Sequence, residues 1–575
     1  MKKEIRLFFV LVALLMLNMK GQAAEWQWSV EIPSMVSDET GGHPTAFLWI
    51  PEDCQRVKAV VVGQHNMCEE TLFENVLFRQ RMKEAGIALV WITPILNQPW
   101  DVATGCNDAL LRALDDLAEV SGYGELGRVP IVPLGHSAMA TYPWNFAAWN
   151  PERTLAVISY HGDAPRTNLC GYGRANLEWG RMRNIDGIPG LMIEGEYEWW
   201  EARVRPALAF RMMYPQSCIS FLCDAGRGHF DVSDRTAAYI ALFLKKVLAA
   251  RLTETYLTAD DAEEGKSVEL KAVNPRDGWL AQRWVRGDGA TGEMRNASSV
   301  TPPRRVKPAP YAQYKGDPHD AFWYFDREMA ELTETIYRDE QNKEPSYVSF
   351  VQEGKLLSYD ENAHVRITAR FRPEADGLTF RMKAVHTDST YRTIVEKAGV
   401  TQPKITRICG PVEQVDDTTF RVSFYRMGMY NRRRTTGITL LASFDGDKER
   451  ERGAGTEFRY PLSAYRRPPP AYSLPRHTRC EAGNGDSETG SCFGLRPACV
   501  LLYKGGAGGS EKRTGGVYSD TASHKVPRKG DCGSMAIWTG RCGADSRARG
   551  ADILYSPMNK LFINVRNSLF YSLKK

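Results

Sequence analysis

The segment spanning residues 131–139 places a serine where an apolar strand ends and a new helix begins. Ile131, Val132 and Leu134 supply the apolar strand, Gly135 interrupts it, and Ser137 follows two residues later. A chain that passes directly from a strand into a helix must turn sharply where the two meet. This segment therefore predicts a strand-to-helix junction with Ser137 at the turn.

Strand and helix patterns alternate through the first half of the chain. Residues 25–32 and 45–50 predict an opening hairpin, and residues 88–93 predict a central strand. The elements expected after these are a helix over 107–120, strands over 155–160, 190–194 and 219–223, and a closing helix over 234–250. Strands that alternate with helices indicate a mostly parallel sheet covered on both faces.

The run Gly135-His136-Ser137-Ala138-Met139 resembles the nucleophile elbow of the α/β-hydrolase superfamily. The family usually has a second small residue two places after the serine, where this chain has Met139. The resemblance implies a doubly wound, mostly parallel α/β-hydrolase sheet over residues 25–252. It also implies that Ser137 is the nucleophile of a catalytic triad.

The family's triad follows the chain order serine, acid, histidine. His229 stands after the last predicted strand in a glycine-rich loop, which is where the resemblance places the base. His136 and His161 are interpreted either as residues that support the site residues or as structural residues, because neither follows the last strand. A neighbouring imidazole makes a serine nucleophilic by accepting its proton.

The acid is assigned to Glu198, in the turn that follows the strand over 190–194. An acid behind the imidazole fixes its tautomer and stabilises the imidazolium. Glu196, Glu201 and Asp163 remain alternatives, because each is near the same turn or follows the preceding strand.

An oxyanion hole requires two N–H donors near the developing negative charge. The resemblance assigns one to Ala138, which follows the nucleophile, and the other to Asn66, which follows the strand over 59–63. The family often has a His-Gly pair there, whereas this chain has Gln64-His65-Asn66. His65, His136 and His161 do not show metal-ligand spacing, so neither a metal nor another cofactor is expected.

Residues 1–24 have the pattern of a secretory signal peptide. Lys2, Lys3 and Arg6 precede an apolar run over 7–17, and Ala23 and Ala24 offer a cleavage site. We therefore expect a secreted or periplasmic protein with no membrane attachment after cleavage, because no later stretch reaches 18 apolar residues. The 74 basic and 69 acidic residues are scattered and nearly balanced, which argues against a nucleic-acid partner.

The twelve cysteines permit disulfide bonds in an exported chain. Cys68 and Cys106 fall in loops above the predicted sheet, where either a disulfide or two free thiols fits the sequence. Cys218 and Cys223 lie on or beside one strand, and their side chains point to opposite faces of the sheet, so no disulfide between them is expected.

Residues 253–345 are interpreted as a connecting, cap-like segment with a Gly- and Pro-rich linker over 286–310. The aromatic residues Phe322, Trp323, Tyr324 and Phe325 fit either a pocket cap that stacks on a sugar or a core segment that packs domains together. Residues 346–465 then change to short alternating strands, at 347–350, 365–371, 379–385, 419–424 and 438–444. This pattern predicts an antiparallel β-sandwich-like domain.

Residues 466–575 lack sustained periodicity. Residues 480–550 alone hold 15 of the 49 glycines and 5 of the 12 cysteines, a composition unlike that of the preceding domains. We interpret the tail either as the product of a reading-frame change near residues 466–470 or as a genuine Gly-rich disordered tail.

The resemblance implies an exported serine hydrolase that cleaves a small-molecule or carbohydrate ester through an acyl-enzyme on Ser137. A serine peptidase with the same triad is one alternative. A non-catalytic glycan-binding protein on a hydrolase scaffold is another. The acyl group, the leaving group and the oligomeric state do not follow from the sequence, because pocket shape sets specificity.

Overall fold

The computed structural model describes residues 26–460, apart from 39, 168–175, 199–200, 253–265, 267, 285–304, 340–342, 361–364, 397–399 and 424–436. The chain divides into two units, residues 1–473 and 474–575, and every described residue belongs to the first. The predicted signal peptide, most of the predicted linker and the tail over 466–575 lie outside the described residues.

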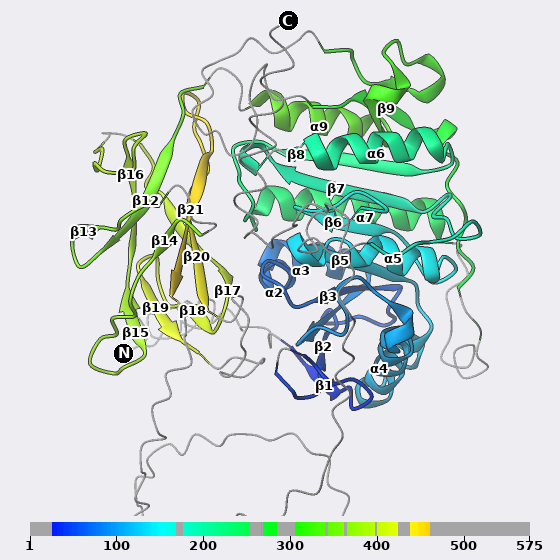
Figure 1. Cartoon of the computed structure of the whole chain (residues 1–575), viewed down its shortest axis with the longest axis horizontal. Helices are drawn as coiled ribbons and strands as arrows, with labels where there is room; N and C mark the ends of the chain where they lie inside the picture. Colours follow the sequence, from blue (N-terminus) through cyan, green and yellow to red (C-terminus); the bar gives the residue numbers. More distant parts are fainter. Residues whose placement is uncertain are drawn as a thin grey trace, which may run out of the picture. The chain divides into compact units, whose positions relative to one another are not determined.

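An eight-stranded sheet occupies the first half of the described chain (Figure 1). Its strand order is β1-β2-β4-β3-β5-β6-β7-β8, and all pairs from β4 onward are parallel. The strands are β1 (Trp28–Glu31), β2 (Thr45–Trp49), β3 (Ala59–Gln64), β4 (Ile87–Thr93), β5 (Ile131–His136), β6 (Val157–Tyr160), β7 (Pro189–Gly195) and β8 (Cys218–Asp224). This sheet confirms the prediction of a mostly parallel α/β-hydrolase core opened by a hairpin.

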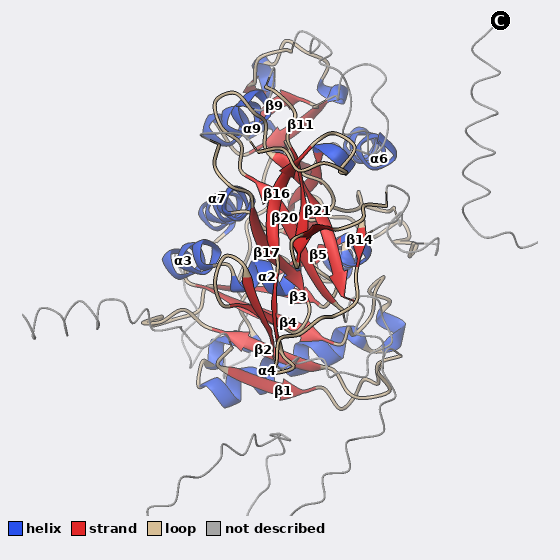
Figure 2. Ribbon diagram, turned by 90° about the vertical axis from the view of Figure 1, so that its left-hand side faces the viewer, coloured by secondary structure: helices blue, strands red, loops and turns tan. Residues whose placement is uncertain are grey.

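Helices cover the sheet on both faces (Figure 2). They are α2 (Glu69–Glu74), α3 (Val76–Ala85), α4 (Cys106–Ser121), α5 (Tyr142–Trp149), α6 (Glu201–Met213) and α7 (Asp234–Arg251). Single 3₁₀ turns at η1 (Val102–Thr104), η2 (Gly124–Gly127), η3 (Ser137–Met139) and η4 (Glu196–Glu198) join them. The predicted helices over 107–120 and 234–250 correspond to α4 and α7.

Two apolar cores lie on opposite faces of this sheet. In β3, Ala59 and Val61 join one core while Val60 and Val62 join the other, as the period of two along a strand requires. The first core includes side chains of α3 and α7, and the second includes those of α4. Each fully buried Val, Leu or Ile side chain contributes about 1.5–3 kcal/mol, so the burial of both faces holds the sheet between its two layers of helices.

Residues 268–339 add a small sheet beside β8. Its strands are β9 (Trp279–Gln282), β10 (Ala309–Pro310) and β11 (Ala321–Tyr324), followed by α9 (Arg327–Asp339), with 3₁₀ turns at η5 (Pro275–Asp277), η6 (Tyr311–Gln313) and η7 (Pro318–Asp320). Phe322, Trp323 and Tyr324 are buried, and the Tyr324 hydroxyl donates to the carbonyl of Phe221 in β8 at 2.7 Å. These aromatic residues therefore pack in the core, as the second of the two interpretations proposed.

The remaining described strands form two further sheets, which we call the β region (residues 344–460). One sheet has the order β13-β12-β21-β20-β17, with β16 pairing β12 and β14 pairing β21, and the other has the order β15-β19-β18. The strands are β12 (Tyr347–Gln352), β13 (Lys355–Leu356), β14 (Ile367–Thr368), β15 (Thr379–Arg381), β16 (Lys383–Thr387), β17 (Lys404–Cys409), β18 (Val412–Gln414), β19 (Thr419–Val422), β20 (Ile438–Phe444) and β21 (Gly453–Tyr460). Both sheets contribute to one apolar core, which confirms the sandwich-like prediction.

Two details of the β region differ from the sequence prediction. The single strand expected over 379–385 is split at Met382, so that β15 pairs with β19 and β16 pairs with β12. Strands that switch sheets in this way make the corners of a sandwich. The pairs β12–β21 and β14–β21 are parallel, whereas an entirely antiparallel region was expected.

The six cysteines in the described part of the chain are free thiols, including Cys68, Cys106, Cys218 and Cys223. The alternative of a Cys68–Cys106 disulfide is therefore wrong. Burial raises the pKa of the Cys106 thiol to about 11, so this group is un-ionised at neutral pH. Within the described ranges, no helix combines the length and apolar character needed to cross a bilayer.

Candidate active site

Ser137 lies at the sharp turn between β5 and η3. Its φ is +54°, a left-handed conformation that costs a non-glycine residue about 1–3 kcal/mol and is concentrated at functional sites. A Cβ atom at Gly135 would lie 2.0 Å from the carbonyl oxygen of Met139, so only glycine fits there. The turn therefore has the geometry of a nucleophile elbow.

The close approach that the family makes at its second small residue occurs one position later in this chain. Met139 is buried in the core that includes α4, whereas Ala140 faces Gly162. A Cβ atom on Gly162 would lie 1.9 Å from the Cβ of Ala140. The close approach expected at position 139 is thus made instead between Ala140 and Gly162.

The structure brings the three predicted triad residues together. His229 Nε2 lies 2.7 Å from Ser137 Oγ, and His229 Nδ1 donates to Glu198 Oε2. Because Nδ1 carries a proton to the carboxylate, Nε2 of the neutral ring is the acceptor for the serine hydroxyl. The Ser137 hydroxyl is thereby placed to lose its proton to an imidazole.

The other acids weighed for this role have different partners. Glu196 accepts a hydrogen bond from the Gly226 N–H at 2.8 Å, and Glu201 pairs with Arg283 at 2.8 Å. Asp163 accepts from the Thr141 hydroxyl at 2.8 Å. Glu198 alone among the four has a described hydrogen bond to His229.

A second imidazole also binds the Glu198 carboxylate. His161 Nδ1 donates to Oε1, while His229 Nδ1 donates to Oε2. The Gly195 N–H donates to Oε1 at 2.9 Å, and Arg203 Nη1 lies 3.5 Å from Oε2. Burial alone would raise the pKa of Glu198, but the two imidazoles hold that pKa well below its usual range, so the carboxylate stays ionised.

His161 has the supporting position that was one of its two interpretations from the sequence. It follows β6 directly, is fully buried and has a φ of +48°. Its Nε2 has no hydrogen-bond partner among the described residues, so the interaction with Glu198 is its anchor. Its position at a strand end, on the same edge of the sheet as Ser137 and His229, was the signal available in the sequence.

His161, Glu198 and His229 also satisfy the spacing of a metal site, because their ligand atoms lie within 4.8 Å of one another. Both Nδ1 atoms, however, already donate to the carboxylate, and His229 Nε2 faces Ser137. A metal bound by this group would have to replace the hydrogen bonds that connect the triad. These three side chains therefore fit a hydrogen-bonded group better than a metal centre.

Replacing His161 by asparagine is expected to reduce stability mainly at low pH. Burial lowers the pKa of His161, but the Glu198 charge and hydrogen bond raise it more, leaving it above the usual 6.5. The stabilisation by protonated His161 is then complete below the unfolded-state pKa and is lost as pH rises through the folded-state value. Asparagine keeps a donor near the Nδ1 position and tolerates positive φ, but does not titrate.

Urea unfolding of both proteins between pH 5.5 and 9 measures this effect. The difference in unfolding free energy should shrink as pH rises, whereas His319→Asn, at an exposed position, should give only a small difference. A His161→Asn difference that is constant or grows with pH contradicts the protonated assignment.

The predicted oxyanion donors occupy different environments. Ala138 follows the nucleophile in η3, and its carbonyl accepts from Gln98 Nε2 at 2.9 Å. The Asn66 N–H donates instead to Glu69 Oε2 at 3.2 Å, and Asn66 Nδ2 donates to the His136 carbonyl at 2.8 Å. In this structure Asn66 therefore supports the residue before the nucleophile.

Glu69 connects the loop after β3 to the nucleophile turn. Its carboxylate accepts hydrogen bonds from the backbone N–H groups of Asn66, Met67 and His136, the last at 2.8 Å. Burial raises the pKa of Glu69 to about 8 despite these donors. Because Glu69 lies on α2 and does not follow a strand directly, sequence reasoning did not identify it.

His136 connects the nucleophile turn to the base. Its Nε2 lies 3.0 Å from the His229 carbonyl and must donate to it, since a carbonyl only accepts. Burial lowers the pKa of His136 well below its usual value, and the nearby imidazoles of His229 and His161 lower it further. His136 is thus neutral and has the structural role expected for it.

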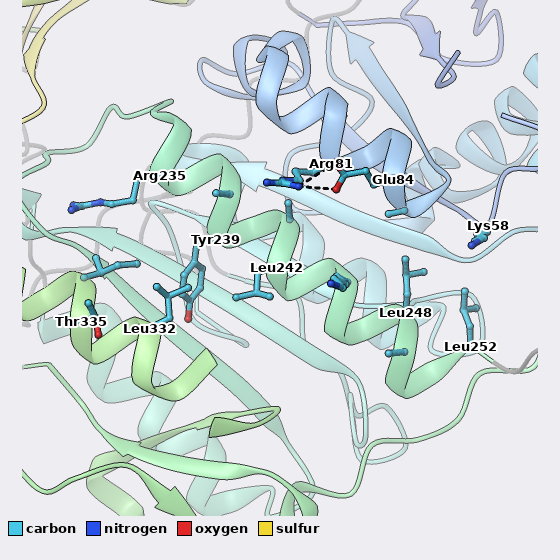
Figure 3. A pocket seen from close by; sticks show the side chains of 16 residues that line it. Lys58, Arg81, Glu84, Arg235, Tyr239, Leu242, Leu248, Leu252, Leu332 and Thr335 are labelled. Atoms are coloured by element: carbon cyan, nitrogen blue, oxygen red, sulfur yellow. Dashed lines mark hydrogen bonds and ion pairs between the residues drawn. The ribbon is translucent and has the colours of Figure 1, made fainter. Parts of the chain in front are cut away.

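A cavity of about 1040 Å³ lies elsewhere, between α3, α7 and α9 (Figure 3). Its lining includes Leu242, Leu248 and Leu332, with Arg81 paired to Glu84 at its edge. Ser137, Glu198 and His229 are not among the lining residues. This cavity is therefore distinct from the candidate active site.

The sheet order and the elbow together define an α/β-hydrolase fold. No family model and no curated protein matches the chain. Among solved structures, the chain is similar to a hyperthermophilic esterase from the archaeon Pyrobaculum calidifontis, with 17% identity, a TM-score of 0.30, and coverage of 43% of this chain and 94% of that chain. It is also similar to Est1E from Butyrivibrio proteoclasticus, with 15% identity, a TM-score of 0.27, and coverage of 39% of this chain and 100% of that chain. A third similar structure is dienelactone hydrolase from Anabaena variabilis, with 17% identity, a TM-score of 0.25, and coverage of 39% of this chain and 98% of that chain.

Proposed function

We propose that this protein is a serine hydrolase that cleaves carboxylic esters through an acyl-enzyme on Ser137. The observation that carries the proposal is the continuous hydrogen-bond chain from Ser137 Oγ through His229 to Glu198. In this mechanism His229 takes the serine proton as Oγ attacks the ester carbonyl, and then protonates the leaving alcohol. Water then attacks the acyl-enzyme as His229 takes its proton, the bond between the acyl carbon and Oγ breaks, and His229 returns the proton to Ser137 Oγ as the carboxylic acid leaves.

The Ala138 N–H is the proposed first donor to the oxyanion of the tetrahedral intermediate. The Asn66 N–H is the proposed second donor, and it can act only by exchanging its bond to Glu69 for the oxyanion. The substrate that we propose is a small-molecule or carbohydrate ester, with an acyl or acetyl group as the part transferred. A serine peptidase and a non-catalytic glycan-binding protein are the two alternatives.

Reaction with a fluorophosphonate probe tests the proposal. The wild-type protein is expected to acquire one phosphonyl group, located on Ser137 by peptide mass spectrometry, because only an activated serine attacks such a probe readily. Ser121→Ala is the matched control, since Ser121 ends α4 and its described side-chain hydrogen bonds join it to Ala118 of the same helix and to Tyr123 of the following turn. A wild-type protein that stays unlabelled would favour the non-catalytic alternative.

The comparison of ester and amide substrates separates the two enzymatic alternatives. Turnover of short-chain aryl esters with no cleavage of peptide amides supports the esterase proposal.

We also propose export, on the basis of residues 1–24. N-terminal sequencing of the protein recovered after expression should then begin near residue 25.

A further inference from the structure

We propose that the β region positions three segments of the active site. These are the loop that carries His229, the segment that carries Glu198, and the helix α2, which holds the proposed oxyanion loop. This inference rests on the proposed function and extends it by giving the β region a role in catalysis. Its basis is a set of buried contacts that cross from the β region to each of the three segments.

The first contact is made by Arg452, which lies between β20 and β21. Its guanidinium donates to Asp224 Oδ1 at 3.0 Å, to the Ala225 carbonyl at 3.1 Å and to the Ser233 hydroxyl at 3.0 Å. Asp224 ends β8, and Ser233 caps the N-terminus of α7. One arginine of the β region therefore joins the two ends of the loop that carries His229.

The second contact runs in the opposite direction, from the His229 loop into the β region. Fully buried Arg227 donates to the carbonyls of Phe444 and Gly453 at 3.0 and 2.6 Å, and to Asp445 Oδ1 at 2.9 Å. Its Nε donates to Asp231 within the loop at 3.0 Å. A planar guanidinium with all these partners holds the loop in one orientation.

Glycine permits the close approach of the two regions. Gly226 has a φ of +75°, and a Cβ atom there would lie 2.6 Å from the Cβ of Arg452. A Cβ atom on Gly195, in the acid segment, would lie 2.2 Å from the Gly228 carbonyl. The β region, the base loop and the acid segment are thus packed in succession without space for side chains.

The acid segment has its own link to the β region. The Tyr197 hydroxyl donates to Glu451 Oε1 at 2.7 Å, and the Tyr197 N–H donates to the Arg227 carbonyl at 2.8 Å. Tyr197 immediately precedes Glu198 in η4. A shift of the β region at Glu451 would therefore move the carboxylate that orients His229.

The third segment is α2, which begins at Glu69. Arg407 of β17 pairs with Glu70 and, at 2.8 Å, with Glu74, and the Thr71 hydroxyl donates to the Ile408 carbonyl at 2.8 Å. Glu69 in turn accepts the N–H groups of Asn66 and Met67. The β region thus reaches the proposed oxyanion loop through the helix that holds it.

The charges at this interface depend on one another. Asp224 and Asp231 are both buried, and a carboxylate oxygen of each lies within hydrogen-bond distance of Thr236 Oγ1, at 3.2 and 2.7 Å. Burial opposes ionisation of Asp231, but Arg227 and Arg452 lower its pKa, whereas burial and the nearby Asp231 raise the pKa of Asp224. Removing an arginine leaves a buried carboxylate uncompensated, so the loop must rearrange.

Arg452→Lys tests the proposal in the full-length protein. Lysine keeps the charge but cannot reach three separated acceptors, so we expect kcat for an aryl ester to fall about 10- to 100-fold with little change in KM. Amide hydrogen exchange over residues 225–233 should accelerate. The matched control is Arg381→Lys, since Arg381 is exposed in β15 and pairs with Glu374 inside the β region.

Tyr197→Phe is the second variant, because it removes one hydroxyl and leaves the packing of the ring intact. A severalfold loss of kcat in this variant supports the proposal even if Arg452→Lys does not fold. Wild-type kcat and wild-type exchange in folded Arg452→Lys, or unchanged kcat in Tyr197→Phe, would overturn it. If the wild-type protein itself turns over no ester, the proposed function fails, while the exchange measurement still decides whether the β region holds the loop.

Discussion

Replacing Ser137 by alanine is expected to reduce ester turnover by roughly 10⁴-fold or more. In the proposed mechanism, the substitution removes the atom that attacks the carbonyl and leaves only the background stabilisation by the rest of the site. The fold should persist, because the side chain gives up one hydrogen bond to His229, a loss of about 0.5–1.5 kcal/mol. The measurements are initial rates on a short-chain aryl ester and the thermal transition of the same preparation.

His229→Ala should lose activity to a comparable extent, and the double variant should be little worse than either single one. Triad members act as a unit, so their effects do not add. Ser121→Ala should behave as wild type. Retained turnover in pure Ser137→Ala protein would remove Ser137 from the mechanism, whatever its conformation.

Ser137 and His229 could be proposed from the sequence because the resemblance supplies a chain order and each residue follows a predicted strand. The carboxyl ends of parallel strands meet at one edge of a sheet, so residues that follow such strands are expected to lie near one another. The turn at Ser137 was predictable from a strand that passes directly into a helix. The same reasoning did not single out the acid, for which four carboxylates stayed open.

The support of the triad could not be predicted, because it depends on contacts between residues far apart in the chain. His161 shares the Glu198 carboxylate across 37 positions, and Arg452 reaches Asp224 across 228. In the sequence, nothing around His161 distinguishes it from an ordinary loop histidine, and nothing around Arg452 distinguishes it from a surface arginine. The division of the predicted strand at Met382 likewise depends on which sheet each half meets.

The ambiguity of the acid had a physical origin as well. Glu196, Glu198 and Glu201 lie within one turn of chain, and sequence spacing alone does not say which carboxylate faces the base. The structure separates them by partner, because Glu196 binds the Gly226 N–H and Glu201 binds Arg283. The same partners supply the controls for the experiment on Glu198.

Glu198→Gln is expected to lower kcat by about 10³- to 10⁴-fold, the size of effect known for triad acids. An amide offers one oxygen and one NH₂ group, but two imidazole Nδ1–H groups donate to the native carboxylate. One imidazole must therefore lose its acceptor. If this is His229, the ring takes the wrong tautomer and can no longer accept the Ser137 proton. The amide also cannot stabilise the imidazolium formed during attack.

Stability should report the same substitution through its pH dependence. The two imidazoles hold the pKa of Glu198 below its usual range, so its contribution to folding is present above the unfolded-state pKa and is lost as pH falls through the folded-state value. The destabilisation of Glu198→Gln in urea should therefore be larger at pH 7 than at pH 4.

For the activity measurement, the matched controls are Glu196→Gln, Glu201→Gln and Asp163→Asn, which should retain most activity. If Glu198→Gln is near wild type and one of these three variants is folded but inactive, the assignment of Glu198 as the acid is wrong.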